Sequence, residues 1–448
     1  MMVKFHSEVM IADKIHSNME VMTMKKFTKI LALCLALVLV VSAFAACGGK
    51  GNDGGQDKPE VLGMSDSPLA APEIKKDFEI KDDFKIGFIC LHDENSTYDL
   101  NFLDAANAVI EALGLTKEQY IIKKNIPEGN ECYEAAKDLV DQGCTLIFAN
   151  SFGHEDFMLK AAKDFKDVEF CHATGFKASL ENLPNYHNAF ASIYEGRYLA
   201  GIVAGLKLNE MIEAGTITAE EAKMGYVGAF TYAEVISGYS SFYLGAKSVC
   251  PSVTMDVKFT GSWYDEQKEK EAAQALINGG CVLISQHADS MGAPTACETA
   301  GVPNVSYNGS TVAACPNTFI VSSRIDWTPY FKYMIEQVEK GEAIATDWTG
   351  TIETGSVVLT DINEKAAAEG TAAKVAEVKA KLLDGSVKVF DTANWTQGGK
   401  KLDSYKADVD TDAKFEKDTE VIEGGVFYES KHRSAPYFDV IIDGITEI

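Results

Sequence analysis

The sequence predicts an α/β protein of two similar lobes, each a doubly wound, mostly parallel sheet, joined by a hinge. Short apolar runs alternate with segments of helical periodicity, which is the pattern of βαβ units. The segment EAAKDLVDQGCTLI at 134–147 returns as EAAQALINGGCVLI at 271–284, with eight of fourteen positions identical. KIGF at 85–88 and KMGY at 223–226 open the two halves at nearly the same offset, so the repeat has the scale of a whole lobe.

The first lobe starts near Phe84 with the buried-strand pattern KIGFICLH. Apolar residues at helical spacing follow, and strand and helix patterns then alternate to residue 174. The expected strands are 85–92, 119–126, 144–150 and 168–174, and the expected helices are 99–113, 132–142 and 155–165.

A long helix at 194–213 leads into the second lobe, where the same order of elements restarts. The strand pattern at 318–327 is expected to cross back to the first lobe, followed by a helix at 328–340. The other expected strands are 223–230, 253–260, 281–286 and 303–309, and the other expected helices are 234–248, 265–278 and 292–300.

These patterns assign residues 84–193 and about 310–345 to the first lobe. Residues 194–309 and part of 346–448 form the second lobe and a C-terminal extension. The extension is less regular than the rest, although 348–362 favours strands and 368–385 favours a helix with alternating charge.

The N-terminal region resembles an export signal. From Met24 it has a basic start, an apolar run and small residues before Cys47. The apolar run is shorter than the roughly 20 residues that span a bilayer comfortably, which disfavours a membrane anchor. The ending Phe-Ala-Ala-Cys resembles a bacterial lipobox, so Cys47 is expected to carry a lipid after removal of residues 1–46. Residues 1–23 contain three acidic residues and fit a start codon assigned too far upstream. Residues 47–83 are rich in Gly, Asp and Pro and predict a flexible tether.

Charge and cysteine usage exclude several classes of protein. A formal net charge of −25 disfavours nucleic acid or an anionic membrane surface as a direct partner. Two of the ten cysteines, Cys34 and Cys47, belong to the signal and its lipid site. The other eight lack paired CxxC spacing, so a zinc site is disfavoured and no metal or cofactor is expected. Buried small hydrophobes are favoured for these eight, with disulfides as the alternative.

The candidate ligand site lies where the strands of both sheets end. Ligands of parallel sheets collect outside the carboxyl ends of the strands, and two facing lobes can enclose a small molecule there. Aromatic rings stack on a flat heterocycle, Asn and Asp read its edge, and a cation offsets a buried carboxylate. Asp99 also fits a helix N-cap, as does Asp265. The candidates are Tyr98, Asp99, Phe102, Asn150, Ser151, Phe152, Trp263, Asp289, Asn308, Arg324 and Trp327.

Several motifs together resemble the BMP family, also called the basic membrane protein or PnrA-like family, of substrate-binding lipoproteins. They are YEGRYLAGIVAG at 194–205, KMGYVGAF at 223–230, GSWYDEQKEKEAAQALINGGCVLI at 261–284 and the lipidated N-terminus. The resemblance covers about residues 84–340. It implies a type I periplasmic-binding-protein fold, anchored at the extracytoplasmic face of the cell membrane. It also implies delivery of nucleosides or related purines to the permease and ATPase of an ABC importer.

The resemblance also suggests roles for individual residues. Asp99 and Phe102 match the family's Asn-Asp…Ser-Phe pattern, with Tyr98 in place of its Asn. Trp263 stands where the family places the aromatic that stacks on the base. The family's glycine-rich loop becomes HADSMG at 287–292, which includes Asp289.

Two replacements fall in the corner of the site that binds sugar in the family. The family's ribose-binding Asp falls near Asn308, and its Lys falls at Arg324. Asn can hydrogen-bond to hydroxyls but cannot accept two such bonds as an anion does. A purine nucleoside, a free purine base and another heterocycle therefore all remain candidate ligands.

Two further functions remain as alternatives. A lipoprotein of the same fold could sense a ligand without transport, because fold does not fix function. A nucleoside-cleaving enzyme would need a carboxylate cluster, a metal set or an activated nucleophile. The sequence has no GxSxG, HExxH or Walker motif, and the group His92-Asp93-Glu94 fits a solvated loop. The sequence therefore favours a binding protein over an enzyme.

Overall fold

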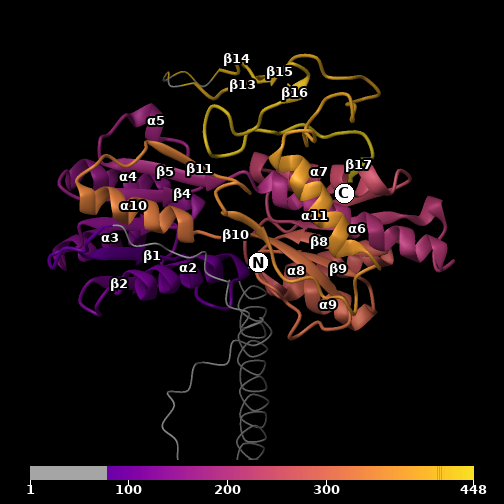
Figure 1. The fold of residues 1–448 in the computed structure, drawn as a ribbon, viewed down its shortest axis with the longest axis horizontal. Helices are drawn as coiled ribbons and strands as arrows, with labels where there is room; N and C mark the ends of the chain where they lie inside the picture. Colours follow the sequence, from indigo (N-terminus) through magenta and orange to yellow (C-terminus); the bar gives the residue numbers. More distant parts are fainter. Residues whose placement is uncertain (1–77, 411, 413, 415) are drawn as a thin grey trace, which may run out of the picture. The chain divides into compact units, whose positions relative to one another are not determined.

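The computed structural model describes residues 78–448, apart from 411, 413 and 415. The predicted signal, Cys47 and residues 47–77 of the predicted tether lie outside the described residues. Two sheets organise the described part of the chain (Figure 1). In spatial order the first sheet is β11 (Asp347–Gly350), β5 (Tyr186–Ala191), β4 (Glu169–Ala173), β3 (Leu146–Ala149), β1 (Ile86–Ile89) and β2 (Tyr120–Lys123), and all its strands are parallel.

The second sheet repeats this arrangement. In spatial order it is β12 (Val357–Leu359), β10 (Phe319–Ile325), β9 (Asn304–Tyr307), β8 (Leu283–His287), β6 (Lys223–Gly228), β7 (Thr254–Phe259) and β17 (Ile445–Glu447). Only β12 runs antiparallel to its neighbour among these strands. The orders β2-β1-β3-β4-β5 and β7-β6-β8-β9-β10 are equivalent, so the repeat predicted from the sequence is a duplicated fold.

Helices cover both faces of each sheet because successive strand residues point to opposite sides. In the first sheet Phe88 and Phe148 pack toward one pair of helices, while Ile89 and Ile147 pack toward the other pair. The pairs are α2 (Thr97–Leu113) with α10 (Thr328–Lys340) and α3 (Asn130–Asp141) with α4 (Glu155–Asp164). On the second sheet the pairs are α6 (Ile193–Glu213) with α7 (Ala233–Val249) and α8 (Glu266–Asn278) with α9 (Gly292–Ala300).

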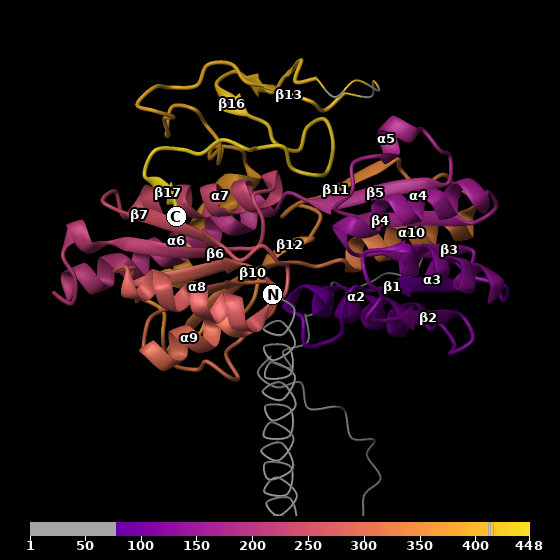
Figure 2. The same ribbon diagram turned by 180° about the vertical axis from the view of Figure 1, so that it is seen from behind.

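The two lobes exchange one helix each. Helix α6 follows β5 of the first sheet along the chain but packs on the second sheet beside α7. Helix α10 follows β10 of the second sheet but packs beside α2 on the first (Figure 2). The strand predicted to cross back differs from expectation, because β10 pairs with β9 and stays in the second sheet. The crossing comes after Ile325, so residues 310–345 are divided between the two lobes.

Two further segments differ from the sequence-based expectation. The strand β5 is not apparent in the apolar pattern, because His187 and Asn188 interrupt it. Both are buried with partners: Nε2 of His187 is 2.8 Å from Glu169 Oε2, and Asn188 Oδ1 accepts from Ala178 N at 2.7 Å. Residues 78–83 do not behave as tether, since the backbone N–H of Lys81 donates to the Glu339 carboxylate at 2.7 Å.

The remaining elements are short, apart from α11 (Thr371–Leu383), which packs on α6. Residues 390–448, here called the C-terminal segment, form a small aromatic cluster in which Phe438 lies 4.2 Å from Phe390 and 4.8 Å from Phe427 between ring centroids. The segment ends in β17, at the edge of the second sheet. The short elements are η1 (Phe152–His154), α5 (Ala178–Glu181), η2 (Ala219–Glu221), β13 (Lys406–Ala407), β14 (Thr419–Glu420), β15 (Ile422–Glu423) and β16 (Val426–Phe427).

All eight cysteines within the described residues are buried and free, as predicted. None of the helices in this part of the chain combines the length and apolar character of a membrane span.

Candidate functional site

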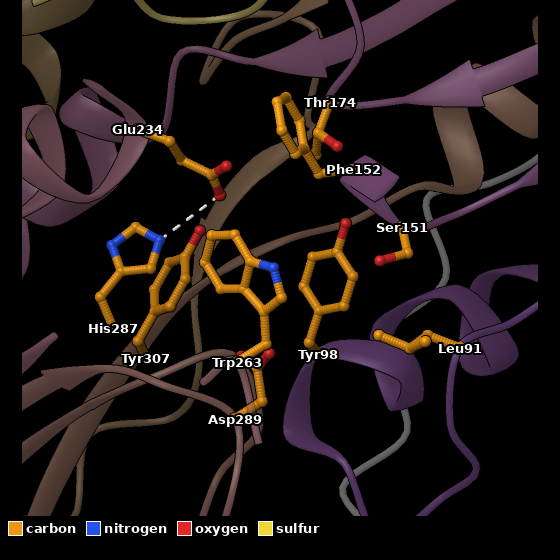
Figure 3. A pocket seen from close by; sticks show the side chains of 10 residues that line it. All are labelled: Leu91, Tyr98, Ser151, Phe152, Thr174, Glu234, Trp263, His287, Asp289 and Tyr307. Atoms are coloured by element: carbon orange, nitrogen blue, oxygen red, sulfur yellow. Dashed lines mark hydrogen bonds and ion pairs between the residues drawn. The ribbon is translucent and has the colours of Figure 1, made fainter. Parts of the chain in front are cut away.

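A cavity lies where the carboxyl ends of the two sheets face each other. Both halves of the chain contribute equally to its wall (Figure 3). The lining residues are Leu91, Tyr98, Ser151, Phe152 and Thr174 from the first lobe, and Glu234, Trp263, His287, Asp289 and Tyr307 from the second. Each follows or ends a strand, or begins the helix after it, as expected for ligand sites of parallel sheets.

Tyr98 is fixed at the start of α2. The helix begins at the N-cap Ser96, whose hydroxyl accepts from the backbone N–H of Asp99 at 3.1 Å. The Tyr98 hydroxyl donates to the carbonyl of Asn150 at 2.6 Å, and its ring packs edge-on against Phe102 with centroids 4.9 Å apart. The hydrogen bond fixes the hydroxyl and the contact with Phe102 fixes the ring, so the Tyr98 side chain is oriented without a ligand.

Thr174 has a backbone conformation that threonine rarely adopts. Its φ is 68°, in the left-handed region that is costly for a β-branched residue. The backbone N–H donates to Ala189 O at 2.9 Å, which ties the turn after β4 to β5. Strain of this kind is retained where the surrounding structure imposes it, and here it falls on a residue that lines the cavity.

Aromatic rings from both lobes meet at the cavity. Trp263 packs against Phe230 with ring centroids 5.1 Å apart, and Tyr232 lies 6.0 Å from Trp263. From the first lobe, Phe152 approaches Tyr232 to 5.5 Å. Such a set of rings provides apolar surface and stacking faces for a flat ligand.

Asp289 links the two lobes through its backbone. Its carbonyl accepts from both the backbone N–H and the hydroxyl of Thr97, at 2.9 and 3.0 Å. Its carboxyl accepts from Asn308 Nδ2 at 3.2 Å, and Asn308 Oδ1 in turn accepts from Asn101 at 3.0 Å. Burial raises the pKa of Asp289 well above its ordinary value, and nearby Glu269 adds to the shift.

Glu234 and His287 form the polar side of the second-lobe wall. Nε2 of His287 lies 3.4 Å from Glu234 Oε1, and the His287 ring packs on Tyr307 with centroids 4.4 Å apart. Burial lowers the pKa of His287, and Glu234 opposes that shift. Behind them, the fully buried Arg197 of α6 donates to Ser285 Oγ at 2.6 Å and lies over the Tyr307 ring at 5.2 Å.

The charge of the wall restricts the ligand. Two of the ten lining residues are acidic, and neither lysine nor arginine is among them. An anionic ligand would lose its hydration without gaining a cation. The cavity suits an uncharged or cationic molecule with hydrogen-bond donors and a flat apolar face.

Five of the eleven candidates from the sequence line this cavity, and these are Tyr98, Ser151, Phe152, Trp263 and Asp289. The other six support it from behind or lie elsewhere. Asp99 is not the N-cap of α2, since Ser96 has that place. Instead the Asp99 carboxylate accepts from Asn150 Nδ2 at 2.7 Å and from the backbone of His92 at 3.0 Å. Asp265 caps α8 as predicted, accepting from Lys268 N at 3.0 Å.

The remaining four candidates do not reach the cavity wall. Phe102 stacks on Trp327 with centroids 4.6 Å apart, and both are buried in the first lobe's core. Asn308 bridges Asn101 and Asp289 as described above. Arg324 is buried and lies 3.8 Å from Asp104.

Five lining residues were not selected from the sequence. His287 directly follows the predicted strand at 281–286, and Tyr307 lies near the end of the predicted strand at 303–309. Their positions therefore pointed to the site, although neither residue was among the eleven candidates. Glu234 starts a predicted helix, where an acidic residue is ordinarily explained by the helix dipole. Leu91 and Thr174 have side chains typical of strand ends and carry no signal of their own.

Comparison with known proteins identifies the family. The model of the Bmp family, described as PnrA-like ABC transporter substrate-binding proteins, matches residues 88–389. The chain belongs to the Bmp family. A purine-binding protein of Brucella abortus is 32% identical over 331 residues, which are 71% of this chain and 88% of that protein. The nucleoside-binding ABC transporter protein BmpA of Lactococcus lactis is 24% identical over 222 residues, 48% of this chain and 58% of that protein.

Solved structures share the fold of this Bmp protein. An ABC transporter solute-binding protein of Aeropyrum pernix aligns with a TM-score of 0.58 at 17% identity, covering 68% of this chain and 92% of that one. One from Conexibacter woesei aligns with a TM-score of 0.56 at 22% identity, covering 68% and 98%. The fold is that of type I periplasmic binding proteins, as predicted. Among the described residues, no group of three or more His, Cys, Asp or Glu side chains could hold a metal ion.

Proposed function

We propose that this Bmp-family protein captures a purine base or purine nucleoside between its lobes and delivers it to an ABC importer. The supporting observation is the cavity at the carboxyl ends of both sheets, where stacking rings and hydrogen-bond acceptors converge without a cation. The names of the two relatives agree with this ligand class.

The proposal includes attachment at the extracytoplasmic face of the membrane through Cys47. It needs no covalent chemistry: the ligand is enclosed by closure of two lobes, and a closed form is presented to the permease. A ligand can drive that closure only if it binds the closed form more tightly than the open form.

A titration of the purified protein with nucleobases and nucleosides tests the ligand class. We expect adenine, guanine, their nucleosides or inosine to bind and to raise the melting temperature, because ligands stabilise the state that they bind. Glucose and a nucleoside monophosphate complete the panel. Absence of binding by every purine would contradict the proposal. If chromatography detects free base after incubation with a nucleoside, the protein is instead an enzyme that cleaves nucleosides.

A substitution of Trp263 tests which side chain stacks on the ligand. If its indole stacks on the purine, Trp263→Ala is expected to weaken binding about 10- to 100-fold, since aromatic contacts contribute about 1–3 kcal/mol per base. Trp263→Phe keeps a ring and should lose much less. Equal affinity of all three proteins would show that the ligand does not use this face.

A further inference from the structure

Glu234 presents a carboxylate to the cavity without a cationic partner in its wall. It lies in the first turn of α7, with a side chain 15% exposed, and Figure 3 shows it beside His287 and above Tyr307. The contact with His287 Nε2 is long, at 3.4 Å. A carboxylate has about four acceptor positions, so most of the accepting capacity of Glu234 remains for a ligand.

His287 is held so tightly that it can position Glu234. Its Nδ1 lies 3.4 Å from the Tyr226 hydroxyl, and its ring rests on Tyr307. Helix α7 passes close by at Gly238, where an added Cβ would lie 2.6 Å from His287 Nδ1. These contacts restrict the orientation of the His287 ring. In this orientation Nε2 points toward the Glu234 carboxylate.

We propose that Glu234, positioned by His287, selects purines that carry an exocyclic amino group over purines that lack one. This inference deepens the proposed function and rests on it. An amino group donates to the carboxylate, whereas a ring carbonyl in the same place would bring two acceptors together. Because the Glu234 side chain is largely removed from water, the unfavourable arrangement cannot be relieved by solvent.

The chemistry of the rest of the wall agrees with this selection. The hydroxyls of Tyr98, Ser151 and Thr174 already donate to the Asn150 carbonyl, the Glu128 carboxylate and the Ala173 carbonyl. These three protons are therefore engaged, and a ligand that brings its own N–H groups complements the Glu234 carboxylate. Trp263, Tyr98 and Tyr307 would contact the faces of the ring, and Glu234 its edge (Figure 3).

Inosine is the informative probe, because it differs from adenosine and from guanosine by single groups. Adenosine carries an amino group at the six-position and guanosine carries one at the two-position. We expect wild-type protein to bind at least one of them about tenfold or more tightly than inosine, as expected for a hydrogen bond to a charged group. Which of the two is preferred identifies the edge that faces Glu234.

Glu234→Gln changes one acceptor oxygen to a donor and should reduce that preference to about threefold or less, while inosine binding holds or improves. His287→Gln should reduce the preference in part, because Glu234 would lose its fixed orientation. Glu266→Gln is the matched control: it has the same change in the first turn of α8, where Glu266 is exposed and outside the cavity wall.

The outcomes separate the two proposals. If wild-type protein binds no purine, the proposed function fails and this inference fails with it. If wild-type protein binds purines but Glu234→Gln keeps the wild-type preference, or if no preference exists, only this inference is overturned. Should Glu234→Gln not fold, Glu234→Asp keeps the charge on a shorter side chain, and an unchanged preference in that variant would overturn the inference equally.

Discussion

Glu429 is a buried acid that couples the C-terminal segment to the second lobe. It is 1% exposed, and burial is the largest cause that raises its pKa, to about 8. The neighbouring Ser237 of α7 opposes the shift, whereas the charges of Glu234 and Glu195 increase it. Near neutral pH the folded protein thus favours the protonated form of this acid, while the unfolded chain ionises it.

This shift makes the stability of the fold depend on pH. A carboxyl whose folded-state pKa is raised contributes stability that is present below its ordinary value of 4.5 and lost as the pH rises through about 8. Between these two pH values the wild-type free energy of unfolding should fall by about 1.4 kcal/mol per pH unit because of this group. We expect Glu429→Gln to lack this contribution. Urea unfolding of both proteins between pH 5 and 8 measures it. The exposed Glu416→Gln is the control, and parallel curves for wild type and Glu429→Gln would refute the assignment.

The sequence predicted cavity-lining residues correctly where they directly follow a strand. It failed where the direction of the side chain decides whether a residue lines the cavity or packs in the core. Tyr98 and Phe102 stand one helical turn apart, yet Tyr98 lines the cavity and Phe102 packs on Trp327 in the core. Both are aromatic and both begin the same helix, so composition could not separate them. The direction of each side chain follows from the contact between α2 and α10, which joins segments more than 200 positions apart.

At the level of elements, α6 and α7 pack closely against each other. The helices approach at glycines: an added Cβ on Gly201 would lie 2.0 Å from the Phe242 carbonyl oxygen, and one on Gly245 would lie 2.1 Å from the Tyr198 carbonyl oxygen. Neither contact can be relieved by rotating a side chain, because the neighbouring atoms belong to the backbone. The middle of helix α6 is buried between α7 and the second sheet, which explains the run of apolar and small residues at 198–206.

Gly201→Ala should therefore force the two helices apart. We expect the free energy of unfolding to fall by about 1–3 kcal/mol, the usual cost of overpacking a core, although alanine is the better helix former. Chemical denaturation measures the change. Glu213→Ala, at an exposed position near the end of the same helix, should leave stability within about 0.5 kcal/mol. A Gly201→Ala protein as stable as wild type would show that the helices can separate freely.

Elements with strong periodicity were predicted well, and those stabilised by distant partners were not. Helices at 265–278 and 292–300 correspond to α8 and α9 within a residue. Strand β5 was not predicted, because the buried polar groups of His187 and Asn188 are satisfied by residues outside the strand. Strand β17 pairs with β7 from nearly two hundred positions away, and its three residues carry no pattern of their own.

For the whole molecule, hydrogen bonds across the lobes define the closed arrangement. Asn101 of α2 donates to Asn308 of the second lobe at 3.0 Å, and both side chains are buried. Neither residue lines the cavity. The bond exists only while the lobes are together, so it favours closure without touching the ligand.

Asn101→Ala should consequently weaken ligand binding by about threefold to tenfold, the equivalent of roughly one net hydrogen bond, through a smaller closed population. Calorimetry gives the affinity, and small-angle X-ray scattering of the free protein gives the change in lobe separation. Asn95→Ala, in the exposed loop before α2, is the control. An unchanged affinity with an unchanged scattering profile would show that closure does not depend on this bond.

The exchange of α6 and α10 between the lobes affects how the chain folds during its synthesis. The first sheet needs Phe331 of α10, whose ring lies 5.1 Å from Phe88 and 4.8 Å from Phe148. It also needs β11 as its edge strand. A nascent chain that ends before residue 318 has every other strand of that sheet but exposes a broad apolar face. Early ribosomal products should therefore be captured by chaperones, and a gene split between the lobes should yield fragments that become soluble only when they are produced together.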